Sequence, residues 1–211
     1  MSDTRFSPTE KDILQELMNI GFGQAAADLA QVIGLSIELS IPDIQLFKVC
    51  ELSRHMAEKM AGEQEFSLVE QYFLGKFQGI ALLALPARSG KKLVSLFGLQ
   101  DQCNWSSENL EMLEKEAMIE VGNILIGACV GKITELLNDV VLFSPPRMMI
   151  QDVRDSILPN NLFAPGSLAI SLKTVFHFER QKITGQLFLI ANQDSIAWLK
   201  TALNTFMEQY E

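Results

Sequence analysis

Residues 12–23 read DILQELMNIGFG, and their pattern returns at residues 116–127 as EAMIEVGNILIG. Each stretch places an acidic residue, a glutamate, an asparagine and a glycine at positions i, i+4, i+7 and i+11, and the two copies are offset by 104 residues. The first copy consists of Asp12, Glu16, Asn19 and Gly23, and the second of Glu116, Glu120, Asn123 and Gly127. A pattern that returns at a fixed offset indicates an internal duplication.

A second feature returns at nearly the same offset. A lysine followed three residues later by a glycine opens an apolar run at Lys76 and again at Lys182, which lies 106 residues further on. Two features in the same order at nearly the same offset strengthen the case for duplication. We therefore predict a single domain over residues 1–211, made of two repeats, about 9–98 and about 106–209, that share one core and are related by a pseudo-twofold axis.

Helix and strand signals follow the same plan in both halves. Ser7 as N-cap, Pro8 at the first helical position and Glu10 three residues after the cap predict a helix that ends at Gly34. In the rest of the first half we expect strands over residues 35–41, 44–50, 66–74 and 77–85 and helices over 52–60 and 86–97. In the second half we expect helices from Ser106 or Ser107 to about 137 and over 194–209, and strands over 140–143, 148–153, 168–178 and 183–191. Short connections favour antiparallel pairing, so the expected class is α+β, with long helices packed on an antiparallel sheet.

The four motif positions of each copy lie within one narrow stripe of a helix, because at about 100° per residue they span only about 60° of its circumference. The other positions of both helices are mostly apolar. Each helix should therefore be largely buried and expose one polar stripe. In the last helix, Trp198, Leu199, Leu203 and Phe206 recur at helical spacing, and we expect them in the core.

Composition excludes several classes of protein. Seventeen basic residues against 26 acidic ones give a net charge of −9 and a pI near 4.8, which argues against duplex nucleic acid as the main partner. No run of 18 apolar residues is present and the first ten residues are polar, so we expect a cytoplasmic protein without a membrane span. Cys50, Cys103 and Cys129 are odd in number and widely spaced, and His55 and His177 are the only histidines, so neither a disulfide framework nor a zinc site is expected.

The motif residues suggest half of an active site. Asparagine is not a base, but its amide can hold a water molecule, as a glutamine does in GTPase sites. Glutamate can accept a hydrogen bond or pair with a lysine. Neither copy offers a nucleophile, a metal cluster or a phosphate-binding loop, so a partner would have to bring the metal and the phosphoryl group. The simpler alternative is that these residues only form the solvent-exposed face of a largely buried amphipathic helix. A helical glycine that costs about 1 kcal/mol at the same stripe position in both copies favours close approach by a partner.

The motif also resembles the signature of the CheC/CheX/FliY family of chemotaxis phosphatases, in which Asp/Ser-x3-Glu-x2-Asn is followed about 22 residues later by proline. Here Asn19 is followed by Pro42, and Asn123 by Pro145 with Pro146 adjacent. Two copies in 211 residues are most similar to the two-site, CheC-type members. The resemblance covers essentially the whole chain.

This resemblance implies an enzyme, a protein aspartyl-phosphate phosphatase acting on a CheY-like response regulator. Asn19 and Asn123 would orient the attacking water, and Glu16 and Glu120 would engage the regulator's lysine. The chain would hold no metal or cofactor of its own, because the regulator supplies Mg²⁺. The other motif positions would contact the partner: Asp12, Gly23, Pro42, Glu116, Gly127 and Pro145. Because Glu116 stands where Asp or Ser is usual, we expect the first site to be as active as the second or more active.

Two alternatives stay open. The chain could be an adaptor that binds a CheY-like regulator, or the receptor deamidase CheD, with little turnover. It could also be a structural component of the flagellar switch. The intact Glu–Asn pair in both copies favours the enzyme, and the lack of room for an additional domain disfavours the switch role. We expect a monomer.

Overall fold

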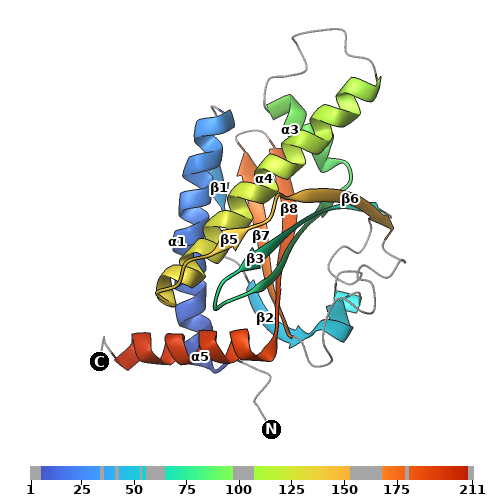
Figure 1. The fold of residues 1–211 in the computed structure, drawn as a ribbon. Helices are drawn as coiled ribbons and strands as arrows, with labels where there is room; N and C mark the ends of the chain where they lie inside the picture. The colour runs from blue at the N-terminus through green and yellow to red at the C-terminus, as the bar shows by residue number, and fades with distance from the viewer. Residues whose placement is uncertain are drawn as a thin grey trace.

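The computed structural model describes residues 6–33, 36–40, 43–52, 54–55, 65–96, 107–152, 168–178 and 181–208 (Figure 1). Along the first half the elements are α1 (Pro8–Ile33), β1 (Ile37–Leu39), β2 (Asp43–Lys48), η1 (Val49–Glu51), β3 (Glu65–Leu74), β4 (Gly79–Pro86) and α3 (Ser89–Leu96). Along the second half they are α4 (Ser107–Leu136), β5 (Leu142–Phe143), β6 (Arg147–Asp152), β7 (Leu168–Phe178), β8 (Gln181–Ala191) and α5 (Gln193–Glu208). The expected α+β class is confirmed. Of the helix expected over 52–60, only Leu52, Arg54 and His55 are described, and they are helical.

The start of α1 shows the predicted capping box. The backbone N–H of Glu10 donates to Ser7 Oγ at 3.1 Å, and the N–H of Ser7 donates to a carboxylate oxygen of Glu10 at 2.8 Å. Glu10 is buried, and its second oxygen accepts a hydrogen bond from Asn204 of α5 at 3.3 Å. Glu10 of the capping box thus also holds the last helix against the first.

All strand pairs are antiparallel, and they form one eight-stranded sheet in the order β1-β7-β8-β4-β3-β5, with β2 also on β7 and β6 also on β3. The two central strands, β4 and β8, come one from each predicted half. Strand β7 of the second half carries β1 and β2 of the first half at its outer edge, and β3 of the first half carries β5 and β6 of the second half. If each strand is replaced by its counterpart in the other half (β1 by β5, β2 by β6, β3 by β7, β4 by β8, and the reverse), the strand order is the same read from the opposite edge of the sheet. This is the arrangement that an internal duplication would produce.

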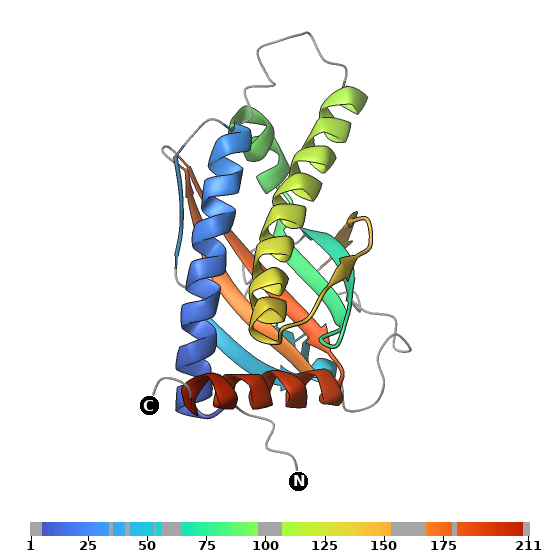
Figure 2. The same cartoon turned by 60° about the vertical axis from the view of Figure 1, so that its left-hand side comes forward.

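The long helices α1 and α4 lie side by side on one face of the sheet, and α5 lies across them at one end (Figures 1 and 2). The main core fills the space between these helices and the sheet, and its largest buried side chains include Phe22, Phe73 and Phe77. A smaller cluster around Phe66 and Phe188 lies on the opposite face of the sheet. Burial there and in the main core accounts for the apolar character of β3, β4 and β8.

Helix α4 is, within the described part of the chain, the one helix long and apolar enough to cross a membrane by length and composition alone. Of its most apolar window, with mean hydropathy 1.4, 56% is buried inside the fold. Its apolar side chains pack on the sheet and on α1, so the core accounts for its hydropathy.

Two of the three cysteines lie in described residues. Cys129 of α4 is fully buried, and burial raises the pKa of its thiol, whereas Cys50 is exposed. Cys103 and the side chain of His177 lie outside the described residues.

Candidate functional site

Both motif stripes lie on the solvent side of their helices. In α1, Asp12, Glu16 and Gly23 are exposed and Asn19 is half-buried, and in α4, Glu116, Glu120 and Asn123 are exposed and Gly127 is half-buried. The residues immediately before the two asparagines point to the core: Met18 is fully buried, and a Cβ added at Gly122 would meet the side chain of Val69 in β3. The amphipathic arrangement therefore follows from the helical period.

The two stripes face away from the contact between α1 and α4. That contact is close at Gly21, where an added Cβ would lie 3.2 Å from the carbonyl oxygen of Ala128 and 3.2 Å from Cγ of Lys132. Gly21 lies about 160° around the helix from Asn19, and Ala128 lies about 140° around its helix from Asn123. The fold thus presents two separate polar surfaces, one on each outer side of the helix pair.

The second stripe is tied to the sheet through Gln71 of β3, which is 3% exposed. The side-chain N–H groups of Gln71 donate to Asn123 Oδ1 at 3.1 Å and to the backbone carbonyl of Ser144 at 3.0 Å. Ser144 is itself held to β3, because its N–H donates to the carbonyl of Tyr72 and its Oγ accepts from the N–H of Tyr72, both at 3.0 Å. The exposed Pro145 follows directly. The asparagine and the proline of the second motif are thus brought together, although they are far apart in the sequence.

The first stripe is less constrained within the described residues. Asn19 makes no side-chain hydrogen bond there. Pro42 lies outside the described residues. Asp43, the next residue, pairs with Lys11 of α1 at 3.4 Å, and both side chains are about half exposed, so this ion pair contributes less than about 1 kcal/mol.

No group of three or more His, Cys, Asp or Glu side chains is placed to hold a metal ion anywhere in the described ranges. In each copy the acids at the first two motif positions lie one turn apart and could supply at most two carboxylates. A divalent cation such as Mg²⁺ takes about six oxygen ligands and keeps water among them. The chemistry of the stripes is therefore that of an amide and carboxylates on a helix surface.

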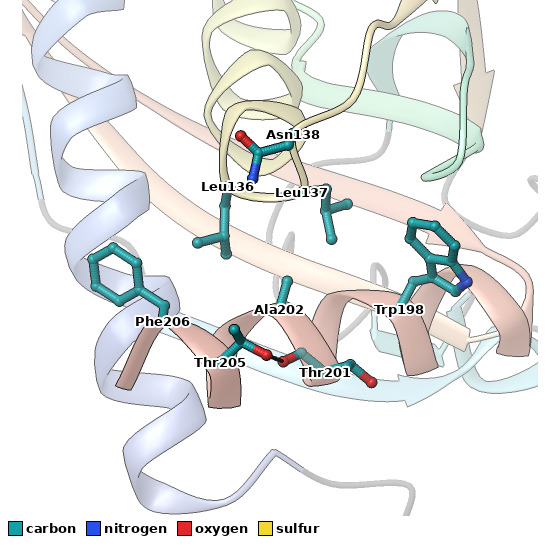
Figure 3. A pocket seen from close by; sticks show the side chains of 8 residues that line it. All are labelled: Leu136, Leu137, Asn138, Trp198, Thr201, Ala202, Thr205 and Phe206. Carbon is teal, nitrogen blue, oxygen red and sulfur yellow. Dashed lines mark hydrogen bonds between the residues drawn. The ribbon is translucent and has the colours of Figure 1, made fainter. Parts of the chain in front are cut away.

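Two cavities are lined by residues outside the motifs. A cavity of about 340 Å³ opens between the end of α4 and α5 (Figure 3), lined by Leu136, Leu137, Asn138, Trp198, Thr201, Ala202, Thr205 and Phe206. None of these side chains is titratable, and none belongs to a motif.

The prediction for the last helix is only partly confirmed. Leu199 and Leu203 are buried as expected, but Trp198 is 45% exposed, so its expected place in the core is wrong. Its ring lies beside the cavity with Lys76 Nζ 5.1 Å from its centre, an arrangement that favours partial exposure.

The second cavity, of about 450 Å³, lies between α3, the first part of α4 and β6. Met148 and Met149 of β6 line it together with Met112 and Met118 of α4. Glu108, Glu111 and Glu114 stand around it. The sequence pattern did not predict this cavity, because it depends on β6 pairing with β3 of the other half.

The described residues thus form an α+β fold that carries two outward Glu–Asn stripes on a pair of helices. The CheC-like family model matches residues 10–45, a range that includes the first motif and Pro42. The "CheY-P phosphatase CheC" of Bacillus subtilis (strain 168) is 23% identical over 202 residues, covering 92% of this chain and 93% of the relative.

Two solved structures share the fold. Thermotoga maritima FliY matches with a TM-score of 0.74 at 19% identity, over 95% of this chain and 98% of that chain. A chain in the CheX–CheY–BeF3–Mg²⁺ complex from Borrelia burgdorferi matches with a TM-score of 0.51 at 17% identity, over 81% of this chain and 95% of that chain. With the family model and the curated relative, these matches confirm the predicted resemblance to the CheC/CheX/FliY family.

Proposed function

We propose that this chain is a phosphatase that removes the phosphoryl group from the aspartate of a CheY-like response regulator. The observation that carries the proposal is the Glu–Asn pair, one turn apart, on the solvent side of both α1 and α4, where only Asn19 is half-buried and the other three residues are exposed. The similarity to a protein named CheY-P phosphatase supports it. A helix surface of this kind can enter the active site of a partner, whereas a pocket enzyme would hold its substrate in a cavity.

In this mechanism each stripe completes the regulator's site. The amide of Asn19 or Asn123 holds a water molecule in line with the phosphoryl group, and orientation of this kind can supply several kcal/mol of the barrier. Glu16 or Glu120 pairs with a lysine of the regulator and fixes the depth and angle of the helix. The Mg²⁺ belongs to the regulator and neutralises charge on the phosphoryl oxygens.

The direct test uses a panel of CheY-like regulators, each phosphorylated beforehand with acetyl phosphate. Phosphate loss is followed with and without this chain. We expect faster loss for at least one regulator from the same organism. Unchanged loss for every regulator that binds the chain would contradict the proposal and favour the adaptor.

The motif glycines allow a prediction in which stability and activity move in opposite directions. A Cβ added at Gly23 or Gly127 would meet nothing within 4 Å, so the fold itself does not need glycine there. Alanine in a helix is about 1 kcal/mol more favourable than glycine, so Gly23→Ala and Gly127→Ala should each raise Tm by about 2–4 °C. If a partner's backbone approaches there, the added methyl groups should lower phosphatase activity by about tenfold at each site.

Gly131→Ala is the matched control for the stability part. Gly131 also has open space at its Cβ position, lies in the same helix as Gly127 and is outside the motif, so it reports the gain from the substitution alone. Thermal unfolding and phosphate release are measured on the same preparations. A Gly23→Ala, Gly127→Ala double variant that is more stable and fully active would show that the glycines do not serve the partner.

A second prediction concerns the metal. Titration calorimetry of the isolated chain with Mg²⁺ should show no tight site, because each stripe offers only two carboxylates and an amide. Phosphate release from the regulator should nevertheless stop when Mg²⁺ is removed by a chelator. A tight site in the isolated chain that disappears in Glu16→Gln or Glu120→Gln would contradict this division of roles.

The switch-component alternative is left open by the match to the FliY fold. It predicts stable binding to flagellar-switch proteins that does not depend on the Glu–Asn pairs. Pull-down with the Glu16→Ala, Glu120→Ala double variant separates the two, because a phosphatase should lose its regulator and a switch component should keep its partners.

A further inference from the structure

We infer that Gln71 is a positioning residue for Asn123, and that the two sites are unequal because the first half has Leu172 at the corresponding position. The inference rests on the proposed function and refines it. It begins with three hydrogen-bonded groups that the fold brings together from β3, α4 and the segment before β6.

The backbone carbonyl of Ser144 sets the orientation of both amides. A carbonyl oxygen can only accept, so the Gln71 atom 3.0 Å from it must be the nitrogen, Nε2. The same nitrogen lies 3.1 Å from the Asn123 amide, so the Asn123 atom that faces it must be the oxygen, Oδ1. Both hydrogens of Nε2 are thereby used. Asn123 keeps its Nδ2 donor and a second lone pair on Oδ1 for a partner.

Gln71 is also costly to bury, which indicates a role beyond packing. Its Oε1 is buried and has no hydrogen-bond partner in the part of the chain that the structure describes. An unsatisfied buried acceptor costs about 1–3 kcal/mol. An apolar residue of the same length would remove this cost, but it would leave the Asn123 amide free to rotate in solvent.

The first half places an apolar residue at the corresponding position. Gln71 is paired with Ala81 of β4. The offset of 106 residues between the Lys-x2-Gly features takes Ala81 to Leu187 of β8, which is paired with Leu172 of β7. Leu172 is fully buried on the helix side of the sheet, as Gln71 is, and its side chain cannot donate a hydrogen bond. At this position the first-site amide therefore has no counterpart of the Gln71 anchor.

A fixed amide lowers the entropy lost when water and phosphoryl group are aligned, so the second site should turn over faster once the partner is bound. The sequence, through Glu116, predicted that the first site is as active as the second or more active, and the inference reverses this order of activity. Docking depends on the exposed stripe, which Gln71 does not join, so Gln71 should affect kcat and leave KM nearly unchanged.

The test is Gln71→Met, a change of similar length that removes both donors, made in the Asn19→Ala background so that the second site alone is read. We expect kcat for a prephosphorylated CheY-like regulator to fall about 10- to 100-fold, with KM within about twofold. Ser144 keeps both hydrogen bonds to Tyr72, so the fold and Tm should be retained. The matched control is Gln186→Met, a buried sheet glutamine on the opposite face, where it bonds Ser171. That control should not change kcat.

Each outcome decides between explanations. A loss of kcat in the Asn19→Ala background, and none in the Asn123→Ala background, supports a positioning role. Equal losses in both backgrounds would show a general structural effect and overturn the inference, as would full activity of Gln71→Met in the Asn19→Ala background. Failure of the proposed function is distinct, because then Asn19→Ala alone would show no regulator-dependent activity above that of the double asparagine variant.

Discussion

The double variant Asn19→Ala, Asn123→Ala is expected to leave phosphate release from a CheY-like regulator at the regulator's own rate. Each single variant should retain the activity of the remaining site. The reason is geometric, because the two stripes face opposite sides of the helix pair and share no residue. Removing one group that orients or stabilises the reacting atoms commonly costs about 10²–10³ in rate. Steady-state release across wild type, both single variants and the double variant measures these contributions.

The comparison requires that all four proteins be folded. Asn19 makes no side-chain hydrogen bond within the described residues, so Asn19→Ala should change stability by less than about 0.5 kcal/mol. Asn123→Ala removes one acceptor from Gln71 and should cost about 1 kcal/mol. Gln24→Ala, which removes an exposed amide of α1 outside the stripe, is the control and should keep full activity. A double variant as active as wild type would mean that the stripes are not catalytic.

Gly79→Ala is expected to destabilise the fold strongly. A Cβ at Gly79 would overlap the backbone carbonyl oxygen of Ile190, and backbone cannot move aside as a flexible side chain can. Gly79 lies in the β4–β8 ladder, where the two halves of the sheet meet, so relief of the overlap must open that ladder. We expect a loss of about 3 kcal/mol or more, and a fall in Tm of at least about 6 °C.

Chemical denaturation with Gly131→Ala as a control checks this prediction. Gly131 has open space at its Cβ position, so the same chemical change should be neutral or stabilising there. The result would also explain why the Lys-x2-Gly feature is found where the apolar run of β4 begins. A Gly79→Ala variant as stable as wild type would contradict the close approach of β4 to β8.

Much of the fold could be predicted from local sequence, because its helices and strands have strong signals of their own. The capping box at Ser7 and the alternation over residues 168–178 locate α1 and β7. The exchange of edge strands could not be predicted, since nothing in β2 or β6 specifies that each pairs with the other half. Pairing of this kind is decided by the packing of the whole sheet.

The candidate site also has features that the local sequence predicts and features that depend on the whole fold. The exposed stripes follow from the helical period, so the sequence alone was enough to place the motif residues on the outer surface of their helices. Gln71 could not be found, because a single polar residue in an apolar strand has no periodic signal and its partners lie 52 and 73 residues away. The structure also supplies a reason for the spacing between asparagine and proline in the second motif, since Asn123 and Ser144, the residue before Pro145, are hydrogen-bonded to adjacent residues of β3.

Multiple-turnover phosphate release is the sharpest test of the proposed phosphatase activity. The CheY-like regulator is prephosphorylated, freed of acetyl phosphate, and mixed in Mg²⁺ with a small catalytic amount of the wild-type chain, and free phosphate is followed over time. If the chain completes the regulator's active site, many phosphates should be released per chain, and the acceleration should vanish in the double asparagine variant. Release that stays at the regulator's own rate, although the two proteins bind, would contradict a catalytic role and leave an adaptor in its place.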